Sequence, residues 1–417
     1  MKFSEYTITA KTEQSLDVLG FSSPFLALRS SLYPQFTVLC NSPLYHGVLA
    51  LVYRTLSRRP VKKSAVQGFA HRFREAEALW GLSVVAAQGT VLNVTKYQAA
   101  LQGREIMALS SIGKGNTIFR SLAYGTLGHY GNPSVLWRFL ERGATKLTGL
   151  GEELAVALDQ RKGGELSRAM AAWLDGASFD QETLMALGKT YNLDAQSGKE
   201  EREVWRKTID AWCKGAPITD TLWQTQLPPE RLAQLRSNAE SYKDFFVYLR
   251  ENYPTLKATL THAEHFEAIS AVCRFLFDGE YLRQHQAGNQ VAYANGVEIE
   301  LATSLVSMAD AYLKLNPRAE PRGLFTQLAA ADGHGEVCGK IVAHHVANQK
   351  AKGALPYIED GRLRVRDRVD RQAYAGLYER LETLDREQHV GMLAYHYRRD
   401  WHVDRAQGYL RYMWGTA

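Results

Sequence analysis

Cysteine and proline are both scarce in this chain, and neither is arranged to form a familiar kind of site. The four cysteines among 417 residues are Cys40, Cys213, Cys273 and Cys338, and none belongs to a Cys-x-x-Cys pair. This spacing argues against a zinc ribbon or a thioredoxin-like centre. The 12 prolines are scattered, and no acidic, glutamine-rich or proline-rich tract interrupts the chain. We therefore expect compact structure over nearly the whole length.

Long hydrophobic runs are also missing. The longest one, residues 44–53, contains His46 and is followed by Arg54, so it is too short and too polar to span a bilayer. The N-terminal sequence MKFSEYTITAKTEQ lacks the apolar region of a signal peptide. These absences predict a cytoplasmic protein with no membrane partner.

Familiar catalytic motifs are absent as well. The chain contains no Glu-x-Lys triple of restriction-type nucleases, no Gly-x-Ser-x-Gly elbow and no His-Glu-x-x-His. Gly113-Lys114 lacks both the upstream glycine and the following hydroxyl of a phosphate-binding loop. The absences favour a non-catalytic protein, and we predict no cofactor and no catalytic residue.

The overall composition is that of a folded protein: hydrophobic residues make up 45% of the chain and charged residues 23%. A length of 417 residues is too great for one ordinary core and predicts roughly two to four domains. The formal charge of +6 permits contact with nucleic acid, which depends on local concentration of Lys and Arg.

Hydrophobic periodicity is mostly helical. Residues 44–59 form an amphipathic pattern that stops at Pro60, and similar patterns joined by short loops follow along the chain. The fold class is therefore expected to be mainly α, with several packed subdomains. A polar stretch at residues 194–207 is the best candidate for a boundary. We expect an N-terminal helical domain over 1–193, a helical middle domain over 194–316 and a C-terminal domain over 317–417.

Residues 105–160 have the outline of a winged helix. A helix pattern over residues 132–143 is followed by the short extended piece ATKLT. A second helix then opens on Thr148, Gly151 and Leu154, and helix, strand and helix in this order are found at the end of many winged-helix domains. An ordinary helical hairpin is the alternative interpretation of the same pattern.

The C-terminal domain has a second winged-helix-like pattern, in which a helix leads into a basic hairpin. The sequence LPYIEDGRLRVRDR alternates apolar and polar residues around Asp360-Gly361, which is a strong signal for a hairpin turn. Four arginines follow at a spacing of two, which places them on one face of a strand: Arg362, Arg364, Arg366 and Arg368.

Four guanidinium groups on one face suit a phosphate backbone or an acidic protein partner. The alternative is a solvated edge strand whose charges prevent aggregation. Other basic residues extend the predicted binding surface: Lys340, Lys350, Lys352, Arg398 and Arg399. The last two lie in a C-terminal cluster rich in Tyr, Trp and Arg, which is a candidate docking surface for a partner because these types are enriched at interface hot spots.

Half of the 12 histidines lie after Asp332, which raises the question of a metal site. His334 and Cys338 have an i, i+4 spacing, but no second pair at zinc-finger distance completes a ligand set. We therefore predict scattered core and surface histidines and no metal.

Two stretches resemble a known group of proteins. They are LDVLGFSSPFLALRSSLYPQFTVLCNSPLYHGVLALVYRTL and NPSVLWRFLERGATKLTGLGEEL. Together they resemble helical proteins of bacterial anti-phage defence clusters, and among these the accessory subunit of SMC-type ATPases in Lamassu-like systems. The resemblance covers roughly the first 160 residues. It implies a non-catalytic subunit that bridges an SMC-type ATPase and a nuclease effector and contacts DNA, and it implies no catalytic residues.

The leading hypothesis is a non-catalytic accessory subunit of a bacterial DNA-directed complex, acting in anti-phage or anti-plasmid defence. Such a subunit bridges protein partners and contacts double-stranded DNA. One alternative is a nucleic-acid-processing enzyme with an unfamiliar metal site built from the C-terminal histidines. Another is a stand-alone winged-helix transcriptional regulator.

Overall fold

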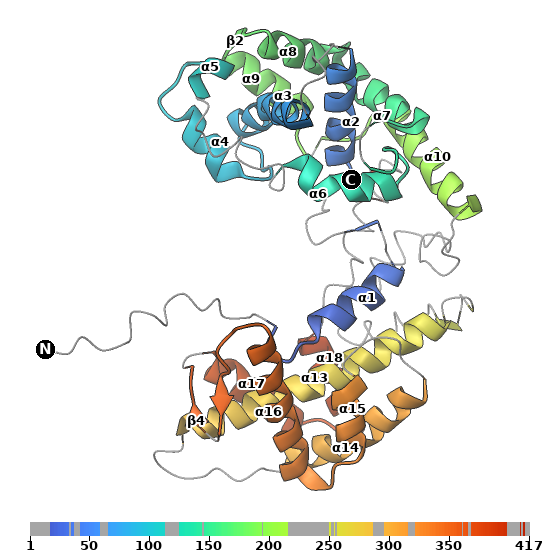
Figure 1. Cartoon of the computed structure of the whole chain (residues 1–417), viewed down its shortest axis with the longest axis vertical. Coiled ribbons are helices and arrows are strands. Elements are labelled where there is room, and N and C mark those ends of the chain that lie inside the picture. The colour runs from blue at the N-terminus through green and yellow to red at the C-terminus, as the bar shows by residue number, and fades with distance from the viewer. Residues whose placement is uncertain are drawn as a thin grey trace, which may run out of the picture. The chain divides into compact units, whose positions relative to one another are not determined.

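The protein is mainly helical. The computed structural model describes residues 17–32, 35–36, 42–58, 66–112, 125–143, 146–193, 195–215, 250–251, 254, 257–286, 296–315, 322–360, 362–365, 368–397, 409 and 412. Within these residues the chain forms sixteen α-helices and only two small two-stranded sheets (Figure 1). The predicted fold class is confirmed. None of the helices in this part of the chain is long and apolar enough to cross a membrane.

The chain divides into two compact units, and each combines segments from distant parts of the sequence. Unit 1 comprises Met1–Leu32 and Glu230–Trp401, and unit 2 comprises Tyr33–Pro229 and His402–Ala417. This division differs from the three consecutive domains suggested by the sequence. Residues 199–207 belong to a helix that packs in unit 2, with Val204, Trp205 and the ion-paired Glu201 buried and most other polar side chains exposed, so this stretch is not a linker.

Unit 2 is built around one buried helix. Its elements are α2 (Leu44–Ser57), α3 (Val66–Ala86), α4 (Val94–Leu101), β1 (Ile106–Ala108), α5 (Leu109–Ile112), α6 (Thr126–Leu136), α7 (Gly149–Asp159), η5 (Gln160–Lys162), α8 (Glu165–Leu174), β2 (Ser178–Asp180), α9 (Gln181–Thr190) and α10 (Lys199–Gly215). Every residue of α2 from Leu44 to Tyr53 is buried, and α3, α6, α7 and α8 pack around it. A helix that is apolar on all sides is stable only in such a core.

The segment predicted to end a winged helix has part of the expected local structure. Residues 140 and 147 form an isolated antiparallel bridge, and α7 begins directly after Thr148. The Thr148 hydroxyl caps α7 by accepting a hydrogen bond from Gly151 N at 3.1 Å. Strand β1, however, pairs with β2, which lies outside residues 105–160. The winged-helix assignment stays a prediction.

Unit 1 is organised around the long helix α13 (Figure 1). Its elements are α1 (Ser22–Leu32), α13 (Lys257–Gln286), α14 (Gly296–Lys314), α15 (Arg322–Ala329), α16 (Gly333–Ala351), β3 (Ile358–Glu359), β4 (Arg362–Leu363), α17 (Arg371–Glu382) and α18 (Arg386–His396). Helices α1, α14, α16, α17 and α18 all contact α13, and its apolar side chains, among them Phe266, Ile269 and Leu276, are fully buried.

The predicted C-terminal hairpin is present. Strands β3 and β4 pair in antiparallel register, with Ile358 opposite Leu363 and Glu359 opposite Arg362. Asp360, the first residue of the turn, has a φ of 50°. Left-handed backbone at this position is what a tight two-residue hairpin turn requires, and Asp tolerates it better than most residues.

Candidate binding site at helix α16 and the basic hairpin

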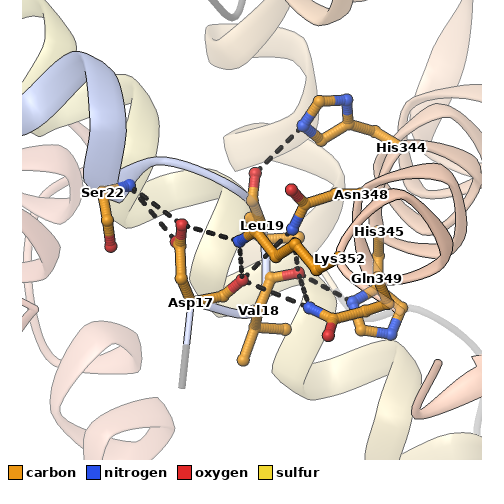
Figure 2. Close-up of polar contacts among 9 residues, drawn as sticks. All are labelled: Asp17, Val18, Leu19, Ser22, His344, His345, Asn348, Gln349 and Lys352. Atoms are coloured by element: carbon orange, nitrogen blue, oxygen red, sulfur yellow. Dashed lines mark hydrogen bonds and ion pairs between the residues drawn. The ribbon is translucent and has the colours of Figure 1, made fainter. Parts of the chain in front are cut away.

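The C-terminal half of α16 presents a row of hydrogen-bond donors on one face. The row consists of His344, His345, Asn348, Gln349 and Lys352, with Lys352 at the C-cap. Positions i, i+1, i+4, i+5 and i+8 lie on one side of a helix. Figure 2 shows these side chains converging on the backbone of residues 17–19, which precede α1. We call this row the donor face and residues 17–32 the strap.

The donor face holds three consecutive carbonyl groups of the strap. The hydrogen bonds join His344 Nε2 to Leu19 O at 3.0 Å, His345 Nδ1 to Val18 O at 2.8 Å, Asn348 Nδ2 to Asp17 O at 3.2 Å and Gln349 Nε2 to Val18 O at 3.1 Å. Because the acceptors belong to the backbone, this part of the contact does not depend on the side chains of the strap. These four hydrogen bonds therefore hold the backbone path of the strap.

Asp17 adds a side-chain contact between the strap and the donor face. Lys352 Nζ lies 3.0 Å from Asp17 Oδ2, and both carboxylate oxygens accept from Ser22 N at 3.2 Å. The carboxylate thus sits at the N-terminus of α1, where unpaired backbone N–H groups favour negative charge. One aspartate therefore joins the end of α16 to the start of α1.

His345 joins the strap to the segment that leads into the hairpin. Its Nδ1 must carry a proton to donate to Val18 O, which leaves Nε2 to accept from Tyr357 N at 2.8 Å. Both ring nitrogens are used by the neutral form, and the side chain is fully buried. Burial lowers the pKa of His345 to about 4, although the hydrogen bond to Val18 opposes the shift. A second proton would have no acceptor.

His345 is expected to make unit 1 sensitive to acid. The pKa is about 4 in the folded chain and 6.5 ordinarily, so the unfolded chain binds the proton first as the pH falls. The contribution of neutral His345 to the free energy of unfolding is fully present above pH 6.5, is lost progressively between pH 6.5 and 4, and does not change further below pH 4. The loss between pH 7 and 5 is about 2 kcal/mol for this group. Urea unfolding followed by circular dichroism at pH 7 and 5 measures this loss. The free energy of unfolding of His345→Gln should fall less between the two pH values than that of the wild type, and an equal fall would contradict the assignment.

The basic hairpin carries more positive than negative charge on one face. Glu359 Oε1 lies 2.6 Å from Lys350 Nζ, and Glu359 Oε2 lies 3.5 Å from Arg364 Nε. Arg362 is exposed and stands directly opposite Glu359 in the ladder. Asp360 in the turn also acts electrostatically on Lys350, so three cations lie near two carboxylates, which leaves an excess of one positive charge. The predicted common face of Arg362 and Arg364 is consistent with this geometry.

The other predicted binding residues do not all join this face. Lys352 is held by Asp17 of the strap. Lys340 pairs with Glu336 at 3.6 Å, ten residues and about 15 Å along α16 from Lys350. Arg368 is exposed beyond the hairpin. Arg366, Arg398 and Arg399 lie outside the residues that the structure describes.

The C-terminal aromatic cluster is not a free docking surface as far as it is described. Tyr409 is fully buried in unit 2. The Tyr412 hydroxyl lies 2.8 Å from Arg161 Nη2 and donates to Glu201 Oε2 at 2.5 Å. Tyr409 belongs to the core of unit 2 and Tyr412 is hydrogen-bonded to residues of that unit, so these two members of the C-terminal cluster contact their own chain. Sequence spacing could not reveal this, because their partners lie more than 200 residues away.

The His334–Cys338 pair belongs to a buried ionic network. His334 Nε2 lies 3.4 Å from Cys338 Sγ and 3.7 Å from Glu298 Oε2. The same Glu298 oxygen is 2.6 Å from Arg283 Nη1, and Tyr374 donates to Glu298 Oε1 at 2.7 Å, so the carboxylate already has strong partners. Burial raises the pKa of Cys338 to about 12, which keeps it a neutral thiol. Among the described residues no group of three or more His, Cys, Asp or Glu side chains could hold a metal ion.

The contact between the donor face and the strap was not predicted from the sequence. The segment HHVANQKAK places five donors at helical spacing, but a row of polar residues on a helix usually faces solvent. Nothing in the sequence indicates that residues 17–19, more than 320 positions away, supply the acceptors. A row of five side chains that can all donate hydrogen bonds is the signal that was available.

Comparisons with known proteins supply no relative from which a function can be transferred. The chain matches no protein-family model, no curated protein and no solved structure. A functional proposal therefore rests on the donor face and the basic hairpin.

Proposed function

We propose that this chain is a non-catalytic accessory subunit of a bacterial DNA-directed complex, of the anti-phage or anti-plasmid defence type. It bridges protein partners, including an SMC-type ATPase and a nuclease effector, and contacts double-stranded DNA through the basic hairpin. The observation that carries the DNA contact is the charge of the hairpin, where Lys350, Arg362 and Arg364 outnumber Glu359 and Asp360 and leave an excess of one positive charge. The two compact units support a bridging role, since each offers its own surface.

The chemistry of this face suits phosphate groups. Arg364 has a 43% exposed side chain and Lys350 a 61% exposed one, so both are accessible despite their contact with Glu359. Guanidinium groups form two parallel hydrogen bonds to phosphate oxygens, and each neutralised phosphate releases counterions. The affinity is therefore expected to fall with salt and to depend little on base sequence.

Removal of the hairpin arginines is expected to weaken duplex binding. The variant Arg362→Ala/Arg364→Ala/Arg368→Ala should bind a short duplex about tenfold or more weaker, because up to three phosphate contacts disappear. The slope of log affinity against log salt should become shallower by about 0.9 for each lost contact. Fluorescence anisotropy between about 50 and 200 mM salt measures both quantities.

Two controls make this test specific. Lys340→Ala removes a cation from α16, the helix that also carries Lys350, at a position far from the hairpin. This variant should leave the duplex affinity and its salt slope unchanged. Replacement of the same arginines by lysine retains the charge and should preserve most of the salt slope. The proposal fails if the wild-type chain binds no duplex at low salt, or if the alanine variant keeps the full slope.

A further inference from the structure

We propose that a cavity between the strap and helix α13 binds a small monocarboxylate, which the guanidinium group of Arg274 holds. The cavity lies within unit 1, and its wall is formed by the strap together with Ser270, Arg274 and Tyr397. Its volume is about 230 Å³. Pockets for drug-sized ligands measure about 300–1,000 Å³, so this one suits a smaller molecule. The inference does not depend on the DNA contact proposed above.

Arg274 brings unused hydrogen-bond donors to the cavity. A guanidinium group has five N–H donors and no acceptor. The Nε atom is engaged by Asp278, whose two carboxylate oxygens lie 2.8 and 2.9 Å away. Within the described part of the chain, no group accepts a hydrogen bond from Nη1 or Nη2 of Arg274. The side chain is 30% exposed, so these two amino groups can be reached from solution.

The direction of these amino groups is fixed by buried partners. The Asp278 side chain is only 6% exposed, and it accepts a hydrogen bond from the Tyr397 hydroxyl at 3.1 Å. Because the guanidinium group is planar and rigid, a fixed Nε also fixes Nη1 and Nη2. Two amino groups in one plane match the two oxygens of a carboxylate through parallel hydrogen bonds. A donor pair that is already ordered binds such a group at a lower entropic cost than a mobile one.

Ser22 supplies a further donor from the strap. Its backbone N–H is held by the Asp17 carboxylate at 3.2 Å, whereas its Oγ makes no hydrogen bond among the described residues. The hydroxyl groups of Ser270 and Tyr397, in contrast, already donate to other protein groups. The donors that these lining side chains leave unused are therefore the Arg274 amino groups and the Ser22 hydroxyl. Such a set requires a ligand with several acceptor oxygens.

The charges around the cavity favour an anion with a single charge. Arg274 is paired with Asp278, and Asp17, which also lines the cavity, is paired with Lys352 at 3.0 Å. Two cations and two carboxylates cancel, so the wall offers donors without an excess of positive charge. A phosphate dianion would bring a second negative charge next to Asp17, and like charges in contact oppose binding. A carboxylate needs only one guanidinium pair.

Saturation-transfer NMR with propionate and the full chain tests the proposal. Propionate should receive saturation from the protein, and its neutral isostere propionamide should compete with it poorly. Arg274→Lys keeps a cation beside Asp278 but loses the parallel donor pair, so the dissociation constant of propionate should rise about tenfold. Ser22→Ala removes one neutral donor and leaves the backbone N–H that Asp17 holds. It should weaken binding by about threefold.

Arg250→Lys is the matched control. Arg250 is another ion-paired arginine of unit 1, held by Glu264, and it does not line the cavity, so propionate binding should stay unchanged. Circular dichroism of each variant reports whether unit 1 remains folded, and Ser22→Ala carries the test if Arg274→Lys does not fold. The proposal is overturned if the wild type transfers no saturation to propionate, or if folded Arg274→Lys binds it as tightly as the wild type. It is also overturned if inorganic phosphate displaces propionate at a lower concentration than acetate does.

Discussion

Replacement of Tyr409 by alanine is expected to lower the free energy of unfolding of unit 2 by about 4 kcal/mol, the usual cost of deleting a large buried aromatic ring. The Tyr409 side chain is fully buried. Its ring centroid lies 4.8 Å from that of Phe36, 5.9 Å from Trp137 and 5.7 Å from Trp205. None of these three rings can move into the space left by the tyrosine ring without losing its own packing, so a cavity would remain.

The Tyr409 hydroxyl adds a polar contribution. It donates to Ser42 O at 3.3 Å and accepts from His46 Nε2 at 3.0 Å, while His46 Nδ1 accepts from Ser134 Oγ at 2.6 Å. His46 is fully buried, and burial lowers its pKa to about 3, so the ring is neutral. Tyr409→Phe leaves the His46 donor without this partner and is expected to cost about 1–3 kcal/mol.

Urea unfolding followed by tryptophan fluorescence measures both variants. Every tryptophan of the chain except Trp401 lies in the stretches assigned to unit 2, so the signal reports on that unit. From the most to the least stable, the expected order is wild type, Tyr409→Phe and Tyr409→Ala. An alanine variant within about 1 kcal/mol of the wild type would show that this residue does not complete the core.

Replacement of Gly188 by alanine is expected to destabilise unit 2 by about 3 kcal/mol, because a methyl group is forced into the contact between two helices. An added Cβ at Gly188 of α9 would lie 1.9 Å from Ser83 O and 2.5 Å from Ser83 C, both in the backbone of α3. A backbone group cannot rotate away as a side chain can. The two helices would have to separate, and α3 packs more extensively against α9 than against any other element.

Gly339→Ala is the matched control for Gly188→Ala. Gly339 lies inside α16, and an added Cβ would meet no atom within 4 Å. Alanine is the better helix former, so this substitution is expected to stabilise unit 1 by about 0.5–1 kcal/mol. Thermal unfolding compares the two variants. Equal midpoints for Gly188→Ala and the wild type would mean that α3 and α9 do not approach as closely as described.

Local features of the fold were largely predictable. The helical class, the cap at Thr148 and the hairpin after Glu359 follow from patterns within a few residues. The organisation into units was not predictable in the same way, because each unit is closed by a segment from elsewhere in the chain. The candidate site was partly predictable: Arg362 and Arg364 share a face with Lys350, whereas Lys340 and Lys352 have other partners.

The sequence by itself determined where helices and the basic hairpin form, because helical periodicity, capping and turn chemistry act between neighbouring residues. Only the tertiary structure decided what the polar side chains do. His345 lies 327 positions from Val18, and His46 lies 363 positions from Tyr409, yet each pair is joined by a hydrogen bond in a buried site. A buried donor is stable only where an acceptor meets it, and packing alone determines where distant parts of the chain meet. For that reason a protein whose sequence contains no familiar motif still contains specific buried hydrogen bonds between distant segments.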